Sequence, residues 1–373
     1  MTPRILIIAG SDSGGGAGIQ ADIKTVTMLG GHAMTAVTAI TAQNTLGVQA
    51  VMPVPTDMVV AQIEACVADF GVDAVKIGMI GSAQTAHAVA DRLSAVGVPI
   101  VFDPVMVATS GDMLADAETI AAFERLMRLA TLVTPNLPEL EALDGESAIM
   151  AQGCALLVKG GHGDSNVLVD RLLTRDGEIR RWESERIATT STHGTGCTLA
   201  SAIATGLARG QDLPTAIDRA RLFVRLALHG APGLGGGHGP MGHQKVRLDL
   251  GSGVRLNHVT VPMAAGSEGF YRTLGLTQIV DTPDGHYARF EAAGGATVSV
   301  EQGAAPTVFF ECDDLAAEVA RLQAAGLVFD HPPVDQDWRW REARLSDPAG
   351  NTVCLYQAGE NRRYPPWRIV LAP

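Results

Sequence analysis

Short apolar runs recur through the first 190 residues of the chain. Five of them are rich in β-branched residues: RILIIAG at 4–10, AVKIGM at 74–79, PIVFDPVM at 99–106, TLVTPN at 131–136 and ALLVKGG at 155–161. Stretches with helical spacing separate them, at 17–30, 56–70, 82–97 and 116–129. Continuous apolar strands that alternate with helices predict a mostly parallel sheet covered on both faces, that is, a doubly wound α/β fold. Ligands of such sheets bind beyond the carboxyl ends of the strands.

Two more helices follow this region. One covers 197–208, where Leu199, Ile203 and Leu207 recur at four-residue spacing and form one apolar stripe. The other begins near Pro214, a residue well suited to a first helical turn, and runs to about His229. The glycine-rich stretch that comes next, GAPGLGGGHGPMGHQK, predicts a boundary.

The remaining sequence contains an internal repeat. Residues 254–302 and 306–358 each read as a strand, a helix and further strands, and their endings, ARFEAAGGATVSVEQ and ARLSDPAGNTVCLYQ, align over fifteen positions. This similarity predicts a duplicated βαβββ unit. We therefore expect a first domain at 1–244, a linker at 245–253, a smaller α+β domain at 254–358 and a tail at 359–373 that packs against one of the domains.

Composition limits the partners and the compartment. The 373 residues are 46% apolar and carry a formal net charge of −12, which argues against nucleic acid or a membrane surface as the main partner. Five scattered cysteines form no CxxC pair, no apolar run approaches 18 residues, and the N-terminal apolar run is too short for a signal peptide. These features predict a cytoplasmic protein. The acidic net charge does not exclude a small phosphorylated ligand, because such sites are built locally.

The segment TSTHGTGCTLASA (190–202) places two glycines before a helix. The first N–H groups of a helix have no partner inside it, and Gly194 and Gly196 leave them open to an anion, although a plain loop-to-helix turn explains the glycines equally well. In the first turn, a thiol at Cys197 has a lowered pKa and could accept a proton from a substrate hydroxyl. The alternative for Cys197 is a small buried apolar residue.

Other chemistry-bearing residues follow strands. AGSDSGGGAGIQAD (9–22) is neither a P-loop nor a clean dinucleotide motif, and indicates a backbone cradle for a ligand. Asp103 and Glu139 offer the oxygen ligands that Mg²⁺ prefers near phosphates. Lys159 supplies a mobile positive charge for a phosphate chain.

Together these motifs resemble a known family. Residues 3–244 are similar to the ribokinase-like hydroxymethylpyrimidine and phosphomethylpyrimidine kinases of thiamine biosynthesis, whose motifs occur here in order: AGSDSGGGAGIQAD, TAITAQNT, KIGM, DPVM, TPNLPE, VKGGH and THGTGCTL. The resemblance implies a role for each of four sets of residues: a catalytic anion hole at Gly194, Thr195, Gly196 and Cys197; a pyrimidine site at Gly10, Asp22, Gln43, Met79 and Val105; an ATP site at Lys159, Asn136 and Thr192; and Mg²⁺ near Asp103 and Glu139.

The implied activity is ATP-dependent phosphorylation of 4-amino-5-hydroxymethyl-2-methylpyrimidine and then of its monophosphate, by a homodimer. We also consider a pyridoxal or other vitamin-precursor kinase, and a non-catalytic ligand-binding or resistance protein. One departure stands out: only 19 residues separate Glu139 from Lys159, which predicts a trimmed helix between them.

Residues 254–358 resemble the vicinal-oxygen-chelate superfamily of glyoxalase I and bleomycin-resistance proteins. The positions that match its metal ligands are His258, Ser299, Thr307 and Cys354, with Glu301 as a possible substitute. Because this set is poor in ligands, we expect a metal-free domain that binds a small molecule, or a scaffold for dimer contacts, with His258 as a core residue. The segment DQDWRWRE (335–342) predicts a strand with Trp338 and Trp340 on one face, as the wall of an aromatic pocket.

Overall fold

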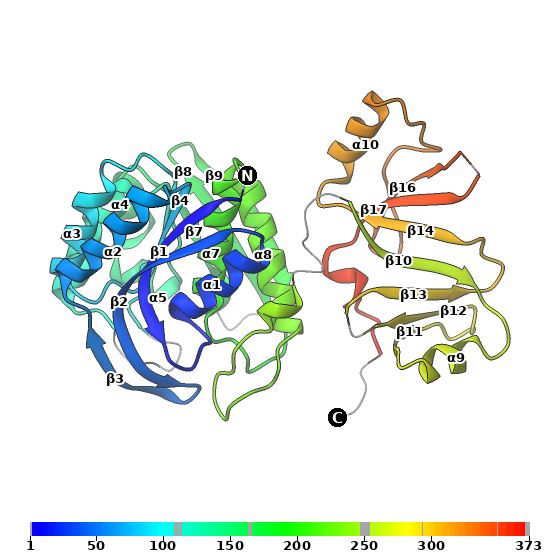
Figure 1. The fold of residues 1–373 in the computed structure, drawn as a ribbon, viewed down its shortest axis with the longest axis horizontal. Coiled ribbons are helices and arrows are strands. Elements are labelled where there is room, and N and C mark those ends of the chain that lie inside the picture. The colour runs from blue at the N-terminus through cyan, green and yellow to red at the C-terminus, as the bar shows by residue number, and fades with distance from the viewer. Residues whose placement is uncertain are drawn as a thin grey trace. The chain divides into compact units, whose positions relative to one another are not determined.

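The computed structural model describes residues 2–107, 111, 114–162, 166–246, 254–292, 294–348 and 350–369. The chain forms two compact units, Met1–Val246 and Arg247–Pro373, each of which is drawn in Figure 1. Of the predicted linker at 245–253, residues 247–253 lie outside the described residues.

The first unit is built on one sheet with the described strand order β3-β2-β1-β4-β5-β6-β7-β8-β9. Strands β1, β2, β4, β5, β6 and β7 are parallel, whereas β3, β8 and β9 pair antiparallel at the two edges. The strands are β1 (Arg4–Asp12), β2 (His32–Asn44), β3 (Gly47–Pro53), β4 (Ala74–Ile77), β5 (Ile100–Phe102), β6 (Leu132–Val133), β7 (Ala155–Val158), β8 (Val167–Thr174) and β9 (Gly177–Glu185).

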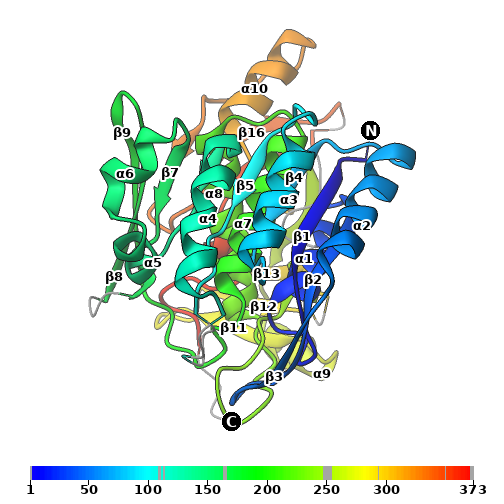
Figure 2. The ribbon, with the colours of Figure 1, turned by 90° about the vertical axis from the view of Figure 1, so that its left-hand side faces the viewer.

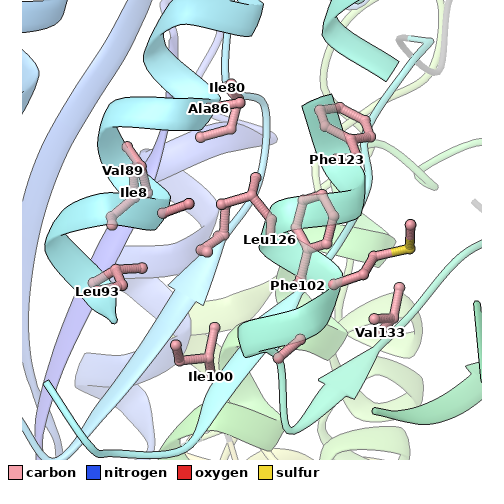
Figure 3. Packing of buried hydrophobic residues seen from close by; sticks show 14 of the residues in the cluster. Ile8, Ile80, Ala86, Val89, Leu93, Ile100, Phe102, Phe123, Leu126 and Val133 are labelled. Carbon is pink, nitrogen blue, oxygen red and sulfur yellow. The ribbon is translucent and has the colours of Figure 1, made fainter. Parts of the chain in front are cut away.

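Helices cover both faces of this sheet (Figure 2). One face packs against α1 (Gly18–Met28), α7 (Thr195–Ala208) and α8 (Leu213–His229). The other face buries the apolar cluster of Figure 3 against α2 (Thr56–Asp69), α3 (Ala83–Leu93), α4 (Ala117–Leu129) and α6 (Gly145–Ala151). The short α5 (Leu137–Ala142) and the 3₁₀ turns η1 (Gly160–His162) and η2 (His243–Lys245) complete the unit.

The predicted α/β arrangement is confirmed. All five apolar runs form strands of the sheet, and all six expected helices occur within a few residues of their predicted bounds. The prediction omitted β2, β3, β8 and β9, in which polar residues interrupt the apolar ones. The segment between Glu139 and Lys159 keeps helical structure, but as the two short helices α5 and α6.

The glycine-rich stretch after α8 belongs to the first unit. The amide of His238 donates to the carbonyl of Thr45 (2.9 Å), and the carbonyl of Gly239 accepts from the amide of His193 (3.2 Å). A Cβ at Gly237 would overlap the Thr45 carbonyl, so this close approach requires glycine. The stretch therefore packs beside both β2 and the turn that precedes α7.

The second unit consists of two consecutive βαβββ repeats, which confirms the predicted duplication. Its described strands have the order β11-β12-β13-β10-β14-β17-β16-β15, and the antiparallel pair β10–β14 joins the repeats. The first repeat is β10 (Arg255–Pro262), α9 (Ser267–Thr273), β11 (Thr277–Asp281), β12 (Tyr287–Glu291) and β13 (Thr297–Glu301). The second is β14 (Thr307–Glu311), α10 (Leu315–Ala324), β15 (Val334–Asp335), β16 (Arg341–Ser346) and β17 (Thr352–Gln357).

This sheet is strongly curved. Helices α9 and α10 pack on one face, and we call the opposite face the inner face. Arg289 on β12 and Trp340 beside β16 are five strand spacings apart, about 24 Å in a flat sheet. Nevertheless, the Arg289 guanidinium carbon lies only 4.5 Å from the centre of the Trp340 ring. The sheet must therefore bend until these distant strands face each other.

The C-terminal segment packs on the second unit, as predicted for the tail. It includes the 3₁₀ turn η3 (Gly359–Arg362). The buried Arg362 donates to the carbonyl of Gly295 (2.6 Å), and the amide of Ile369 donates to the carbonyl of Ile279 (2.9 Å). These bonds connect the segment to β11 and to the loop between β12 and β13.

The strand predicted around Trp338 is wrong. Residues 336–340 form a turn in which Arg339 has a φ of +63°, and β16 begins only at Arg341. The turn separates the two indoles: Trp338 is 39% exposed, whereas Trp340 is 2% exposed. Of the two indoles, Trp340 alone joins the inner face.

In the described part of the chain, no helix combines the length and the apolar character needed to cross a membrane.

Candidate active site

Three neighbouring parallel strands bring polar residues together at their carboxyl ends. Asp103 follows β5 and Lys159 follows β7, and the lysine ammonium lies 2.7 Å from the Asp103 carboxylate. Thr134, after β6, donates its hydroxyl proton to the same oxygen (2.9 Å). Burial raises the pKa of Asp103, but the charges of Lys159 and Lys76 outweigh it and hold the pKa below its usual value. Both partners of the central pair are therefore ionised.

Asn136 and Glu139 lie next to this pair, at the start of α5. The Asn136 side chain accepts from the Glu139 amide (2.8 Å), and the Glu139 carboxylate accepts from the Asn136 amide (2.8 Å). This reciprocal capping fixes the direction of the Glu139 side chain. Burial and the nearby charge of Asp103 raise the pKa of Glu139 to about 7, although Lys159 opposes them. A cation beside Glu139 would lower this pKa and favour the ionised carboxylate.

The amino-terminal end of α7 faces the same residues. Gly194 is the N-cap residue with φ +82°, and no side chain caps the helix. A Cβ at Gly196 would lie 3.3 Å from both the Asp103 carboxylate and the Lys159 ammonium, so α7 begins directly beside the ion pair. Thr195 is the first helical residue. The structure thus brings Asp103, Glu139 and Lys159 to uncapped amides that carry the positive end of the helix dipole.

The pKa of the Cys197 thiol is raised, whereas the sequence predicted a lowered value. Loss of hydration raises its pKa to about 11, and the nearby charges of Asp22 and Asp103 act in the same direction. The charge of Lys76 and a hydrogen bond from the Gly18 amide oppose this shift without reversing it. Burial of the thiol therefore outweighs the effect of its position at a helix N-terminus. Cys197 is a neutral thiol at neutral pH.

Asp22, which the resemblance assigned to the pyrimidine, forms a buried network instead. One carboxylate oxygen pairs with the ammonium of Lys76 (2.9 Å), and the other accepts from the hydroxyl of Ser201 (2.7 Å). Both charged side chains of this pair are fully buried. The network connects α1, β4 and α7, and leaves Asp22 no free oxygen in this structure.

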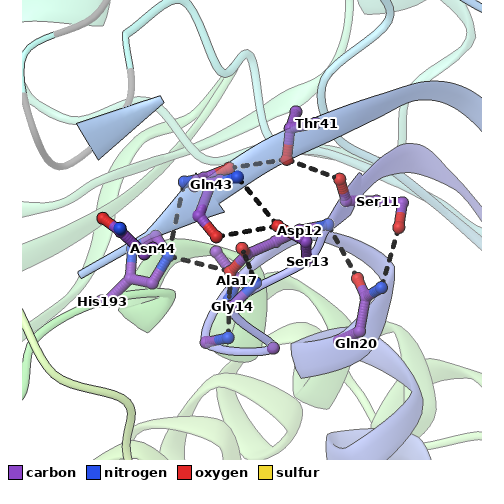
Figure 4. Close-up of polar contacts among 12 residues, drawn as sticks. Ser11, Asp12, Ser13, Gly14, Ala17, Gln20, Thr41, Gln43, Asn44 and His193 are labelled. Atoms are coloured by element: carbon purple, nitrogen blue, oxygen red, sulfur yellow. Dashed lines mark hydrogen bonds and ion pairs between the residues drawn. The ribbon is translucent and has the colours of Figure 1, made fainter. Parts of the chain in front are cut away.

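Asp12 organises the glycine-rich loop that precedes α1 (Figure 4). Its carboxylate accepts from the amides of Gly14 (2.8 Å), Gly16 (2.9 Å) and Ala17 (2.8 Å). The same carboxylate lies 2.9 Å from the Nε2 atom of His193. Although burial raises the pKa of Asp12, its hydrogen bonds to His193 and to the loop amides lower the pKa further, below its usual value. The carboxylate is thus a charged anchor for the loop.

The two glycine-rich turns of the site pack directly against each other. A Cβ at Gly194 would overlap the carbonyl oxygen of Gly16, and a Cβ at Gly16 would overlap the His193 ring. Residues 14–17 and 193–194 are therefore in contact through backbone and ring atoms. The bond between Asp12 and His193 connects the loop before α1 to the turn before α7.

The remaining predicted residues lie along the same edge of the sheet. A Cβ at Gly10 would lie 3.0 Å from the sulfur of Met79, so these two residues are adjacent. The Gln43 side chain accepts from Thr41 (3.1 Å), and its Nε2 atom lies 3.5 Å from the His193 ring.

The predicted residues Val105 and Thr192 have more local partners. The amide of Val105 donates to the carbonyl of Asp103 (2.8 Å). The hydroxyl of Thr192 lies 3.1 Å from the ring of His238, in the glycine-rich stretch after α8. Thr192 therefore connects that stretch to the turn before α7.

Sequence reasoning did not single out three residues that hold this site together. Lys76 stood inside KIGM, His193 inside THGTGC, and Asp12 inside the glycine-rich loop, and none was given a role. A lysine in an otherwise apolar strand run was the available signal, because a buried lysine requires a carboxylate partner. No comparable signal distinguished His193 from the many histidines of ordinary loops.

In the second unit, the positions that match the metal ligands of the superfamily have other partners. His258 is buried with its Nδ1 atom 2.9 Å from the Thr297 hydroxyl, and Ser299 lies 3.5 Å from its Nε2 atom. Cys354 is buried on β17, and Glu301 is exposed at the end of β13. Across the described residues, no three His, Cys, Asp or Glu side chains are grouped to hold a metal ion. His258 is a hydrogen-bonded core residue, as expected.

Comparison with known proteins identifies the first unit. The phosphomethylpyrimidine kinase family model matches residues 12–242. The chain belongs to the phosphomethylpyrimidine kinase family. It is thus a kinase, as the leading prediction stated, and this result favours that prediction over the alternative of a non-catalytic protein. The model of the glyoxalase, bleomycin resistance protein and dioxygenase superfamily matches residues 255–355, in agreement with the duplicated repeat.

Relatives match the first unit closely. A hydroxymethylpyrimidine/phosphomethylpyrimidine kinase of Streptomyces coelicolor is 46% identical over 65% of this chain and 94% of its own length. The thiamine biosynthesis bifunctional protein ThiED of Geobacter sulfurreducens is 46% identical over 64% of this chain and 52% of its own length.

Solved structures confirm the ribokinase-like fold. The ADP complex of Bacillus subtilis pyridoxal kinase is 34% identical, with a TM-score of 0.62 over 66% of this chain and 100% of that one. The phosphomethylpyrimidine kinase of Clostridium difficile is 34% identical, with a TM-score of 0.51 over 60% of this chain and 98% of that one.

Proposed function

We propose that the first unit transfers the terminal phosphoryl group of ATP to hydroxymethylpyrimidine and then to its monophosphate. The observation that carries this proposal is the convergence of Asp103, Glu139 and Lys159 on the uncapped start of α7. That arrangement provides charges and amide donors for a phosphate chain, which is what phosphoryl transfer mainly requires of a protein. The names of the most similar relatives supply the substrate.

In this proposal, the migrating phosphoryl group binds at the amides of residues 195–197. Gly194 and Gly196 keep side chains out of its path, and the helix dipole stabilises its charge. Lys159 turns from Asp103 toward the phosphates and neutralises them. Asn136 and Thr192 stand at the edges of the same region and orient the nucleotide.

The donor set near the phosphates fits Mg²⁺. Asp103 and Glu139 offer two carboxylates from adjacent strand ends, and hard oxygen ligands of this kind suit the ion. When bound, Mg²⁺ would neutralise the β- and γ-phosphate charge. The protonation of Glu139 should respond more to the ion than that of Asp103, because burial and the nearby charge of Asp103 raise the pKa of Glu139.

The pyrimidine would lie at the carboxyl ends of β1, β2 and β4. Gln43 offers an amide donor and acceptor to an aminopyrimidine edge, and Gly10 leaves room above Met79. Val105 adds an apolar contact. Asp22 acts through Lys76, which it holds in place under Cys197, rather than by direct contact. Cys197 contributes packing and a thiol donor instead of a base.

The test is a coupled ADP-release assay with purified protein. Hydroxymethylpyrimidine, its monophosphate and pyridoxal are compared at equal concentrations, with Mg²⁺ present or chelated. We expect turnover of both pyrimidines, lost on chelation. Turnover of pyridoxal alone would overturn the substrate assignment but leave the phosphoryl site intact.

A pyridoxal kinase remains the second candidate, because a solved pyridoxal kinase aligns with a higher TM-score (0.62) than a solved phosphomethylpyrimidine kinase (0.51). Both substrates are six-membered nitrogen heterocycles with a hydroxymethyl group. The same assay separates them through the ratio of their kcat/KM values.

We also propose a cytoplasmic homodimer for this kinase. All five cysteines are free thiols, which suits a reducing compartment. Multi-angle light scattering of the purified chain would test the dimer, and a mass of one chain at micromolar concentration would exclude it.

A further inference from the structure

The inner face of the second unit buries an arginine that has no acidic partner. Among the described residues of this unit, three arginines are buried: Arg289, Arg362 and Arg363. Arg362 pairs with Glu311 (3.4 Å), and Arg363 pairs with Glu291. Among the described residues, no carboxylate pairs with Arg289, which is 6% exposed. One buried positive charge therefore remains uncompensated.

Only neutral groups contact the Arg289 guanidinium. Its Nε atom donates to the hydroxyls of Tyr287 (2.8 Å) and Ser299 (3.3 Å), and its Nη1 atom donates to the carbonyl of Arg362 (3.1 Å). Its Nη2 atom donates to no residue that the structure describes. Isolated buried charges are costly, so a guanidinium in this setting attracts an anion.

A second, independent donor lies beside it. The indole Nε1 atom of Trp340 is buried and has no hydrogen-bond partner among the described residues. The ring of Trp340 is 2% exposed, stacks on Tyr356 at 4.6 Å between centroids, and has the Arg289 carbon 4.5 Å from its own centroid. An indole N–H can only donate, so it too requires an acceptor. Two unsatisfied donors thus lie within reach of one small group.

The neighbouring side chains do not compete for an anion. Burial, together with the charges of Arg289 and Arg362, holds the pKa of His258 well below its usual range, so this ring is neutral. Phe309 packs against His258 and Tyr356 at 4.7 and 5.8 Å between centroids. Glu311 is engaged by Arg362 and by the side-chain amide of Asn257 (2.6 Å). The surroundings are apolar or already paired.

We propose that the inner face of the second unit binds a small carboxylic acid, whose carboxylate meets the Arg289 fork and accepts a hydrogen bond from the Trp340 indole. A planar carboxylate matches the two parallel donors of a guanidinium, and its single negative charge matches the single uncompensated arginine. The bound carboxylate replaces the Arg362 carbonyl at Nη1, so the segment 359–363 must shift to admit it. This proposal does not depend on the kinase activity of the first unit.

The test observes Trp340 directly in the full chain. The sequence has four tryptophans, so ¹⁵N-labelled protein gives at most four indole N–H resonances, and Trp340→Phe assigns one of them. Sodium benzoate is titrated at constant ionic strength, with inorganic phosphate in a parallel series. We expect the Trp340 resonance to shift saturably with benzoate and little with phosphate.

Three variants complete the design. Arg289→Met should weaken benzoate binding by more than about tenfold, because it removes a charged donor. Trp338→Phe and Arg321→Met are matched controls at more exposed positions and should bind benzoate like the parent. The unshifted resonances of Trp338 and Trp367 verify that Arg289→Met keeps the second unit folded.

Three results would overturn the proposal. One is a Trp340 resonance that does not move up to about 10 mM benzoate, the range of very weak binding. Another is equal benzoate affinity in folded Arg289→Met. The third is a phosphate response that matches the benzoate response, which would remove the carboxylate assignment. Faster hydrogen exchange of residues 359–363 on saturation would support the required shift of that segment.

Discussion

In the first unit the buried carboxylates Asp22 and Asp103 each meet a lysine, whereas in the second unit the buried Arg289 meets only neutral groups. The first arrangement fixes α1, α7 and the strand ends relative to each other and leaves backbone amides as the open donors. The second leaves a side-chain charge as the open donor. Buried charge thus positions elements in the first unit, whereas in the second unit one buried charge, that of Arg289, has no carboxylate partner among the described residues.

The largest expected difference is between removing a paired and an unpaired buried charge, measured as the change in the free energy of unfolding. Lys76→Met leaves the buried Asp22 carboxylate without its partner and should lower the free energy of unfolding of the first unit by about 3–5 kcal/mol. Arg289→Met leaves no carboxylate without a partner and should change the free energy of unfolding of the second unit by less than about 1 kcal/mol. Hydrogen exchange in a urea series, resolved by peptide mass spectrometry, reports each unit separately.

The exposed pair Arg92–Glu64 supplies the control for this contrast. Both side chains are 54% exposed, so Arg92→Met should cost no more than about 1 kcal/mol. Equal losses of unfolding free energy in Lys76→Met and Arg289→Met would show that the paired and the unpaired buried charges do not differ in their effect on stability.

A valine at Gly196 tests whether backbone donors are the open groups of the first unit. Its side chain would project toward Asp103 and Lys159, and it should lower kcat by about 10²–10³-fold, the range for losing one transition-state donor. Gly269→Val in α9 is the control, because a Cβ there meets nothing within 4 Å. A normal rate in Gly196→Val would refute the anion hole at α7.

Glu139 allows the comparison to be sharpened by pH. Its folded pKa of about 7 exceeds the ordinary 4.5, so the folded state binds the proton more tightly. Without Mg²⁺, the contribution of Glu139 to the stability of the first unit is therefore fully present below pH 4.5 and is lost as the pH rises through about 7. Glu139→Gln should match the parent near pH 4.5, exceed its Tm at pH 8 and lose activity.

Added Mg²⁺ tests whether the Glu139 carboxylate itself binds the ion. The ion should raise the Tm of the parent at pH 8 more than that of Glu139→Gln, because ligand binding stabilises the folded state. Identical Mg²⁺ responses would exclude Glu139 as a ligand.

The smallest expected effect concerns Cys197. Because its thiol is neutral at working pH, Cys197→Ala should lower kcat only about tenfold, or about 1.4 kcal/mol, through lost packing. The parent kcat should stay flat between pH 8 and 9, above the pKa of Glu139. Cys66→Ala, at a half-buried cysteine of α2, controls for thiol loss. A kcat that climbs with pH across this range would restore the thiolate base.

The sequence predicted those features that depend on periodicity and on strand ends. Apolar runs located the central strands, and parallel strands necessarily bring Asp103, Glu139 and Lys159 to one edge. The edge strands β8 and β9 were missed because Asp170 and Arg171 interrupt the apolar residues of β8, and because β9 is mostly polar and resembles a loop in composition.

Properties that depend on distant neighbours could not be predicted. The pKa of Cys197 is raised mainly by burial, and then by the charges of Asp22 and Asp103, which lie more than 90 positions away in sequence. The role of His193 appears only when residues 12 and 193 are adjacent. Likewise, the positive φ of Arg339 that exposes Trp338 and buries Trp340 leaves no signature in an aromatic-basic run.

The contact between Gly16 and Gly194 has a consequence for redesign of the kinase. Main-chain atoms meet there, with no intervening side chain to absorb a change. A mutation that reshapes the glycine-rich loop before α1, beside the proposed pyrimidine site, will therefore also displace the turn before α7, where we propose that the phosphoryl group binds. Attempts to retune substrate choice within residues 13–18 will therefore alter turnover as well, and the two traits will have to be optimised together.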